Sequence, residues 1–266
     1  MHFTVRHETL YRYSAPVRLG DQLLRLKPFG VRTLDHRYEI SPAPAWQEER
    51  ISPHGTPETR VGFLGETREL RIVSRFTCES IAPPAPETLP PLPWDMPDMA
   101  TCLGTGEENL IIEFAQQLLR DSGAPLPFLH HLTETLYART RRHIRPTGYA
   151  QTPSETLSSG AGACRDLAVL FIATCRSLGI PARFVSGYQA RAETPDGKRH
   201  LHAWPEVYLP GLGWQGFDPT HGVAVTDGHV GLAAAPDQIG TMPIEGGFWG
   251  DGVTSELSFG VEIGVE

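Results

Sequence analysis

A cysteine placed between a glycine-rich turn and an apolar run is the feature that most constrains this chain. Residues 160–166 read Gly-Ala-Gly-Ala-Cys-Arg-Asp, and residues 167–178 form an apolar, helix-compatible segment. Cys164 is therefore predicted at a helix N-terminus, where the positive end of the helix dipole and unpaired backbone N–H groups favour thiolate over thiol. Because thiolate is the nucleophilic form, this is the position in which a protein would place a reactive cysteine.

A histidine and an aspartate follow Cys164 in an order that suits nucleophilic catalysis. His202 lies in a strand-like segment, and Asp218 ends the next such segment 16 residues later (218 − 202). A hairpin would bring the two side chains together. We predict Cys164 as nucleophile, His202 as general base and Asp218 as the acid that fixes the tautomer of His202. The backbone N–H of Cys164 is the expected oxyanion donor.

Three further residues near these motifs are candidates for contact with the substrate or the oxyanion: Gly162, Trp204 and Tyr149. We expect Gly162 to be glycine because substrate approaches the turn closely.

A zinc site is the competing interpretation of the same segment. His200 and His202 are two residues apart, so on a strand both would point to one face, and Cys164 or Asp218 could complete the shell. The sequence offers no evident fourth ligand, and we therefore predict no metal and no cofactor. A zinc-dependent hydrolase remains one alternative. A non-catalytic peptide-binding module is another, although such a module would be expected to have lost one of the three groups.

The bulk composition restricts the partners. The net charge of −8, with no basic run, argues against nucleic-acid binding. No stretch approaches the ~20 apolar residues of a membrane span. The N-terminal residues alternate polar and apolar side chains and lack the apolar region of a signal peptide, so we expect a cytoplasmic protein with a peptide or protein substrate. No oligomeric state is predicted.

The chain divides into three predicted parts. Residues 1–82 alternate in hydrophobicity between Pro and Gly punctuation, which predicts a small antiparallel β-sandwich with strands over 3–7, 22–26, 37–40 and 69–76. Residues 83–104 are proline-rich and form a linker. Residues 105–266 form the catalytic core, with an alternating segment at 255–265 as a closing strand.

Within the predicted core the hydrophobic period changes to that of helices. Helices are expected over 110–119, with a stop at Gly123, and over 127–142, and a short turn at 153–157. Strands are expected over 182–190, 201–209 and 213–217, with turns at 194–197 and 210–211.

The remaining cysteines have no CxxC spacing, which argues against a disulfide framework or a zinc knuckle. Cys175 lies on the same expected helix as Cys164 and is interpreted as a small buried apolar residue, and so is Cys78.

Four segments of the core resemble the transglutaminase-like superfamily: 162–168, 176–188, 202–208 and 213–220. Residues 7–13 and 24–28 are similar to the N-terminal β domain of its bacterial branch, whose members are described as transglutaminase-like enzymes or cysteine peptidases. The resemblance implies an α+β fold, in which a papain-like core packs the nucleophile helix on an antiparallel sheet after a small β-sandwich domain.

For the site, the resemblance implies a triad of Cys164, His202 and Asp218 that cleaves or transfers at an amide bond through an acyl-enzyme. Hydrolysis is favoured over transfer to an amine because water is the default acceptor. The chain has no acidic cluster resembling the calcium sites of the animal enzymes.

Overall fold

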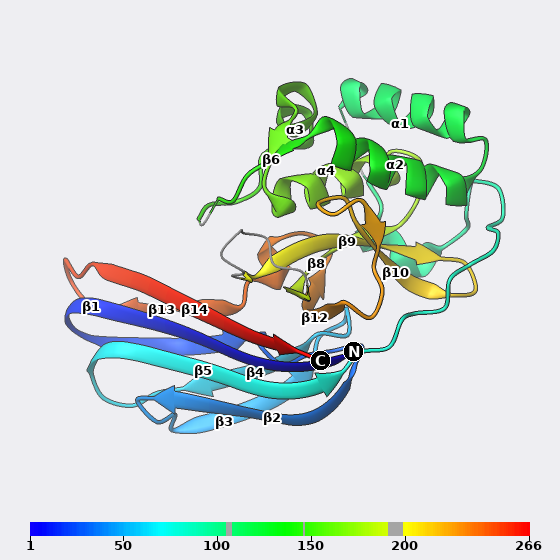
Figure 1. Cartoon of the computed structure of the whole chain (residues 1–266). Coiled ribbons are helices and arrows are strands. Elements are labelled where there is room, and N and C mark those ends of the chain that lie inside the picture. Colours follow the sequence, from blue (N-terminus) through cyan, green and yellow to red (C-terminus); the bar gives the residue numbers. More distant parts are fainter. Residues whose placement is uncertain (105–107, 146, 191–198) are drawn as a thin grey trace.

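The computed structural model describes residues 1–104, 108–145, 147–190 and 199–266, and it has two parts (Figure 1). The first is a β domain with strand order β2-β5-β1-β4-β3, joined by two strands from the C-terminus. Its N-terminal strands are β1 (His2–Leu24), β2 (Arg32–Ser41), β3 (Trp46–Ile51), β4 (Pro57–Gly62) and β5 (Thr67–Glu79).

Strand β1 is long enough to pair with strands in both halves of this domain. Its first half pairs with β5, and its last residues pair with β4. The strands expected at 3–7 and 22–26 are therefore one continuous strand. Pro16 does not break it, because this residue falls in the interval between Arg12 and Val17 where the pairing with β5 shifts register. A proline lacks the N–H that a regular ladder position would require.

The C-terminal segment returns to the β domain, which corrects the predicted domain boundaries. We expected residues 255–265 to close the catalytic core. Strand β14 (Ser255–Val265) instead pairs antiparallel with β1 from Tyr13↔Ser255 to Phe3↔Val265, and β13 (Ile244–Trp249) pairs with the other half of β1. In Figure 1 the red C-terminal strand lies beside the blue N-terminal strand. The β domain is thus built from both ends of the chain.

The second part packs helices on an antiparallel five-stranded sheet of order β11-β10-β9-β8-β12. The helices are α1 (Asn109–Ser122), α2 (Pro125–Arg139), α3 (Pro153–Ser159) and α4 (Cys164–Arg176). The strands are β8 (Ala182–Gln189), β9 (His202–Leu209), β10 (Gly213–Asp218), β11 (Val223–Ala224) and β12 (His229–Ala235). The expected α+β class is confirmed, and no helix in the described residues is long and apolar enough to cross a membrane.

The helix ends follow local signals with one exception. Gly123 ends α1 with a φ of 74°, as the sequence predicts. Helix α2 ends at Arg139 rather than at 142, because residues 141–142 form the short strand β6, which pairs parallel with β7 (Ala161–Gly162). The turn expected at 210–211 joins β9 to β10, whereas the turn expected at 194–197 lies outside the described residues.

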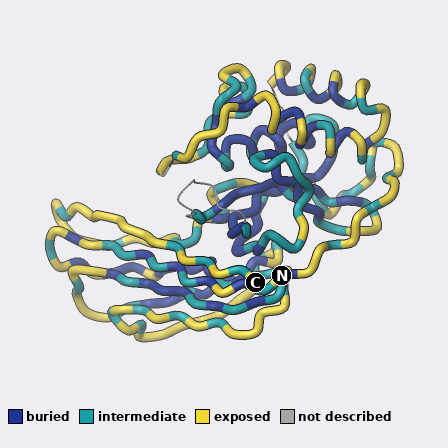
Figure 2. The backbone as a smooth tube through the Cα atoms, viewed as in Figure 1, coloured by how far each residue is buried: buried dark blue, intermediate teal, exposed yellow. Residues whose placement is uncertain are grey.

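The proline-rich segment has no strand and only a short 3-10 helix, η1 (Pro97–Cys102). Its apolar side chains Leu89, Leu92 and Trp94 pack against the helical core, and the Trp94 indole donates to the carbonyl of Pro90 at 3.0 Å. The linker is therefore attached to the surface of the second part. Figure 2 shows the densest burial in α4 and in the central strands of both sheets.

The turn between β3 and β4 packs the β domain against the five-stranded sheet. The hydroxyl of Thr56 donates to the carbonyl of Ala234 at 3.0 Å and accepts the N–H of the same residue at 2.8 Å. Arg183 of β8 donates to the carbonyl of His54 at 2.9 Å. Tyr188 of β8 also lies in the apolar core of the β domain. These contacts hold the two parts in one arrangement.

His7 of β1 provides a test of this interface. Its Nδ1 lies 2.6 Å from the hydroxyl of Tyr188, and burial lowers the pKa of the imidazole to about 4. Because the folded pKa is below the unfolded value of ~6.5, the stabilisation is complete above pH 6.5 and is lost as the pH falls towards 4. We expect the free energy of unfolding to fall by about 3 kcal/mol over this range from His7 alone. Urea titrations at a series of pH values measure the free energy of unfolding, and its fall with decreasing pH should be shallower in His7→Asn than in wild type. An equal pH dependence in the two proteins would contradict the assignment.

Candidate active site

Cys164 is the first residue of α4 and is partly exposed. The turn before it is shaped by packing. Gly160 ends α3 with a φ of 56°, a region that favours glycine. A Cβ on Gly162 would lie 2.9 Å from Cβ of Asp166. Contact with Asp166 therefore accounts for glycine at position 162, where we had expected close approach of substrate.

Asp166 fixes the start of α4 and was quoted in the sequence motif without a role. Its buried carboxylate accepts the N–H of Ala163 at 2.7 Å and the N–H of Gln151 at 2.8 Å, and it forms a two-point ion pair with Arg145 at 3.0 and 2.8 Å. The next side chain, Arg165, donates to the carbonyl of Arg145 at 2.7 Å. The loop before α3 is thus fastened to the turn that presents Cys164.

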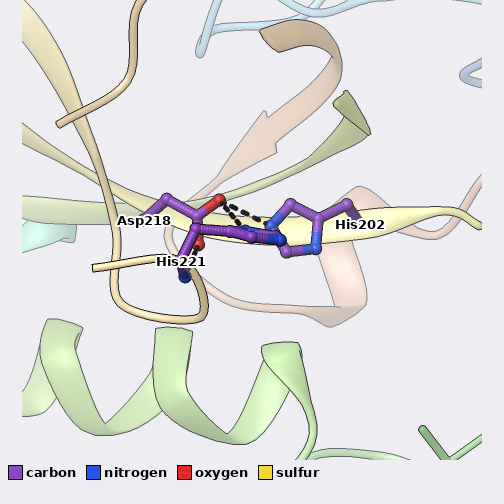
Figure 3. Close-up of side chains that lie close together, drawn as sticks. All are labelled: His202, Asp218 and His221. Carbon is purple, nitrogen blue, oxygen red and sulfur yellow. Dashed lines mark hydrogen bonds and ion pairs between the residues drawn. The ribbon is translucent and has the colours of Figure 1, made fainter. Parts of the chain in front are cut away.

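The structure brings His202 and Asp218 into contact. His202 begins β9, Asp218 ends β10, and the two strands form one hairpin. Nε2 of His202 lies 2.9 Å from Oδ2 of Asp218, and both side chains are fully buried (Figure 3). Because Nε2 of His202 is hydrogen-bonded to Asp218, Nδ1 is the nitrogen through which His202 would exchange a proton with a nucleophile.

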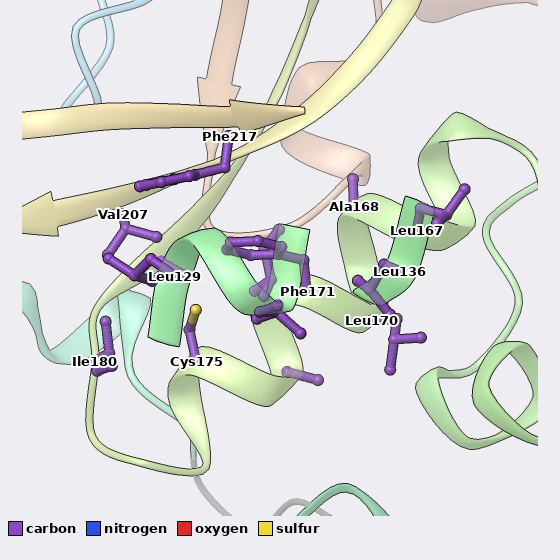
Figure 4. Close-up of a cluster of buried hydrophobic side chains, with 14 of the residues drawn as sticks. Leu129, Leu136, Leu167, Ala168, Leu170, Phe171, Cys175, Ile180, Val207 and Phe217 are labelled. Carbon is purple, nitrogen blue, oxygen red and sulfur yellow. The ribbon is translucent and has the colours of Figure 1, made fainter. Parts of the chain in front are cut away.

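Helix α4 packs directly on this hairpin. The buried cluster between them contains Ala168 and Phe171 of the helix together with Val207 and Phe217 of the strands (Figure 4). Cys164 packs at its border. The Phe171 and Phe217 rings are stacked with centroids 5.7 Å apart. The cluster therefore holds α4 and the His202–Asp218 pair in one packed unit.

Two further histidines, which sequence reasoning missed, bind the same carboxylate. Nδ1 of His221 lies 2.8 Å, and Nε2 of His229 3.0 Å, from Oδ2 of Asp218. Oδ1 accepts the N–H groups of Thr220 and His221 at 2.9 and 3.2 Å. Burial alone would raise the pKa of Asp218, but the charge of His202 and the three imidazole hydrogen bonds hold it well below its usual value. Only the spacing of His221, three residues after Asp218, could have indicated such a contact.

The other predicted site residues lie at different depths. Trp204 is buried beside the histidines, and its ring centroid lies 6.0 Å from that of His202 and 5.2 Å from that of His229. Tyr149 is 67% exposed, in the loop held by Arg145, which donates to its carbonyl. The Trp204 ring thus packs against the histidine rings, while the Tyr149 side chain is exposed at the surface.

The pair of histidines considered for the alternative zinc site does not lie on one strand. Strand β9 begins at His202, so His200 precedes it. Among the described residues, the groups close enough to share an ion are His202, Asp218 and His221, whose ligand atoms lie within 4.8 Å of one another. His200 and Cys164 are not members of this set, and hydrogen bonds already account for its geometry.

Comparisons with known proteins agree with the fold. Residues 112–219 match the family model of the Transglutaminase-like superfamily, and residues 3–79 match that of the Bacterial transglutaminase-like N-terminal region. A crystal structure from Cytophaga hutchinsonii, of a protein with a provisional cysteine-protease name, superposes with a TM-score of 0.74 at 22% identity, covering 99% of this chain and 90% of that one. At this identity the similarity concerns the fold.

The relatives found by sequence differ in how much is known of them. An uncharacterised protein of Mycobacterium tuberculosis is 28% identical over 98% of this chain and 92% of its own length. A protein-glutamine gamma-glutamyltransferase of Pseudomonas aeruginosa is 34% identical over 32% of this chain and 15% of its own length. With both family models placed on one chain, this protein belongs to the transglutaminase-like superfamily and carries the N-terminal region of its bacterial branch.

Proposed function

We propose that this protein is a thiol-dependent enzyme that cleaves or transfers at an amide bond of a peptide or isopeptide through an acyl-enzyme. Cys164 is the nucleophile, His202 the general base and Asp218 the orienting acid. The observation that carries the proposal is the buried 2.9 Å contact between His202 and Asp218, on a hairpin packed against the helix that Cys164 begins.

The proposed reaction gives each of these groups one role. Nδ1 of His202 takes the proton of Cys164, and the sulfur attacks the carbonyl carbon of the amide. In this proposal the backbone N–H of Cys164, at the helix N-terminus, stabilises the oxyanion. His202 then gives its proton to the leaving amine as the carbon–nitrogen bond breaks, which leaves a thioester. Water, activated by the same imidazole, hydrolyses the thioester and restores the thiol.

A labelling experiment tests the nucleophile without knowledge of the substrate. We expect an iodoacetamide probe at pH 7 to modify Cys164 first, because the buried thiols react slowly. Burial raises the pKa of Cys78 to about 11, and it also raises the pKa of Cys102. Peptide mapping by mass spectrometry identifies the modified residue. Equal labelling of wild type and His202→Ala would argue against the proposed pair.

The choice between water and an amine as acceptor requires a substrate assay. We expect incubation with casein and a biotinylated primary amine to yield new peptide N-termini or released ammonia rather than biotin on casein, because water is the default acceptor unless the site excludes it. Cys164-dependent biotin incorporation would assign the protein to acyl transfer instead, with the same nucleophile.

A further inference from the structure

Oδ2 of Asp218 lies within 3.0 Å of a ring nitrogen of each of three histidines, which come from different elements of the fold. His202 begins β9, His221 follows β10 and His229 begins β12. A carboxylate only accepts hydrogen bonds, so each nitrogen that faces it must carry a hydrogen. The geometry therefore places the hydrogen on Nε2 of His202, on Nδ1 of His221 and on Nε2 of His229.

The far side of each outer histidine is consistent with this arrangement. Nε2 of His221 lies 3.3 Å from the amide nitrogen of Gln189, which donates to it, so His221 is neutral with its hydrogen on Nδ1. His229 is nearly buried, and Nδ1 of its ring has no hydrogen-bond partner among the described residues. A second N–H there would be unpaired, and burial also lowers the pKa of His229. Both outer histidines are thus neutral donors.

These donors remove the freedom that a lone aspartate would have. Oδ2 is held by the imidazoles, while Oδ1 is held by the backbone N–H groups of Thr220 and His221. The carboxylate cannot rotate about its side-chain bonds without breaking several of these contacts. The orientation of His202 follows, because its Nε2 hydrogen points at an oxygen whose position is already fixed.

We propose that His221 and His229 are positioning residues, which fix the Asp218 carboxylate and thereby the tautomer and orientation of His202. Gln189 supports them by holding His221 in the tautomer that can donate. The catalytic consequence rests on the proposed function, in which His202 is the general base. The tautomers themselves are a property of the folded protein whether or not it is an enzyme.

Nitrogen-15 NMR of labelled histidine tests the tautomers in the full-length Cys164→Ala protein at pH 7.5, where no thiolate perturbs His202. We expect the hydrogen on Nε2 of His202 and His229 and on Nδ1 of His221. The last assignment is the discriminating one, because free histidine prefers the Nε2–H form. In Gln189→Leu, His221 should populate the Nε2–H form as well. A wild-type His221 with its hydrogen on Nε2 would overturn the proposal.

The rate of Cys164 alkylation by iodoacetamide at pH 7 tests the consequence for the site. We expect His221→Ala and His229→Ala each to react about tenfold more slowly than wild type, the effect of losing one hydrogen bond to a charged group. His221→Asn and His229→Gln keep a donor at the position of the lost nitrogen and should react within about twofold of wild type, provided that they keep the donation. Thermal melts show whether each variant is folded.

The outcomes separate the two proposals. Unchanged alkylation in the folded alanine variants, with His202 still in one tautomer, would show that the outer histidines do not position it. If an alanine variant does not fold, the rate of Cys164 alkylation in Gln189→Leu tests the same positioning role. A wild-type Cys164 that reacts no faster than a free thiol would instead contradict the proposed function, while the NMR assignments would still decide the arrangement of the cluster.

Discussion

Replacing Cys164 with alanine is expected to abolish turnover and probe labelling while the protein remains folded. Without the sulfur no acyl-enzyme forms, and the loss of a nucleophile costs about 10⁴-fold or more in rate. The side chain is small, partly exposed and at the first position of α4, so the free energy of unfolding should fall by less than about 1 kcal/mol. Substrate turnover, intact mass after labelling and thermal melts measure the three expectations.

Cys175→Ala is the matched control, because the residue lies on the same helix in the opposite environment. Its thiol is fully buried in the core cluster, and burial raises its pKa. We expect full labelling of Cys164 in this variant and a loss of about 1 kcal/mol of stability from the cavity. Turnover of Cys164→Ala within tenfold of wild type would rule out the nucleophile assignment.

The local motifs predicted where the three proposed triad residues lie in the fold, because each is defined by its own stretch of chain. A cysteine between a glycine turn and an apolar run predicts its own helix N-terminus, and His202 and Asp218 lie on adjacent strands of one hairpin. His221 and His229 could not be found in this way. Their contact with Asp218 depends on how the chain folds back between β10 and β12, a path that hydrophobic period does not encode.

The same limit applies to the fold. Alternation over residues 255–265 indicates a strand but is silent about its partner, and pairing with β1 joins segments about 250 residues apart. Proline and glycine in β1 indicated breaks, yet register shifts accommodate them within one strand. Both errors concern long-range pairing, whereas the end of α1 at Gly123 follows from adjacent residues.

Asp218→Asn is expected to lower both activity and stability, more than the same change would in a triad with a single hydrogen bond. The carboxylate accepts three imidazole N–H groups on Oδ2 and two backbone N–H groups on Oδ1. An amide offers one oxygen only. If that oxygen faces the histidines, its NH₂ group meets the N–H groups of Thr220 and His221; if it faces the backbone, the NH₂ group meets the imidazoles. Each orientation sets donors against a donor in a buried site.

We expect turnover of Asp218→Asn to fall by about 10³- to 10⁴-fold, because an amide cannot stabilise the imidazolium and selects the wrong tautomer. The rate of Cys164 alkylation at pH 7 should fall with it. The free energy of unfolding should decrease by about 2 to 4 kcal/mol at pH 7. Because the pKa of Asp218 is depressed in the folded protein, this stabilisation is present above the ordinary carboxyl pKa of ~4 and is lost as the pH falls below it.

Urea denaturation at pH 7 and at pH 3, with alkylation kinetics at pH 7, measures these effects together. The stability difference between wild type and Asp218→Asn should shrink at pH 3, because the carboxyl group of the unfolded wild type is then largely protonated while the depressed pKa of Asp218 keeps the folded carboxylate ionised. Asp237→Asn, at an exposed carboxylate of the same domain, controls for the change of charge and should leave both measurements unaltered. If Asp218→Asn instead alkylates at the wild-type rate, Asp218 holds only the turn after β10 and the third member of the triad lies elsewhere. Cys164 and His202 would then keep their roles, because neither assignment depends on which acid orients the imidazole.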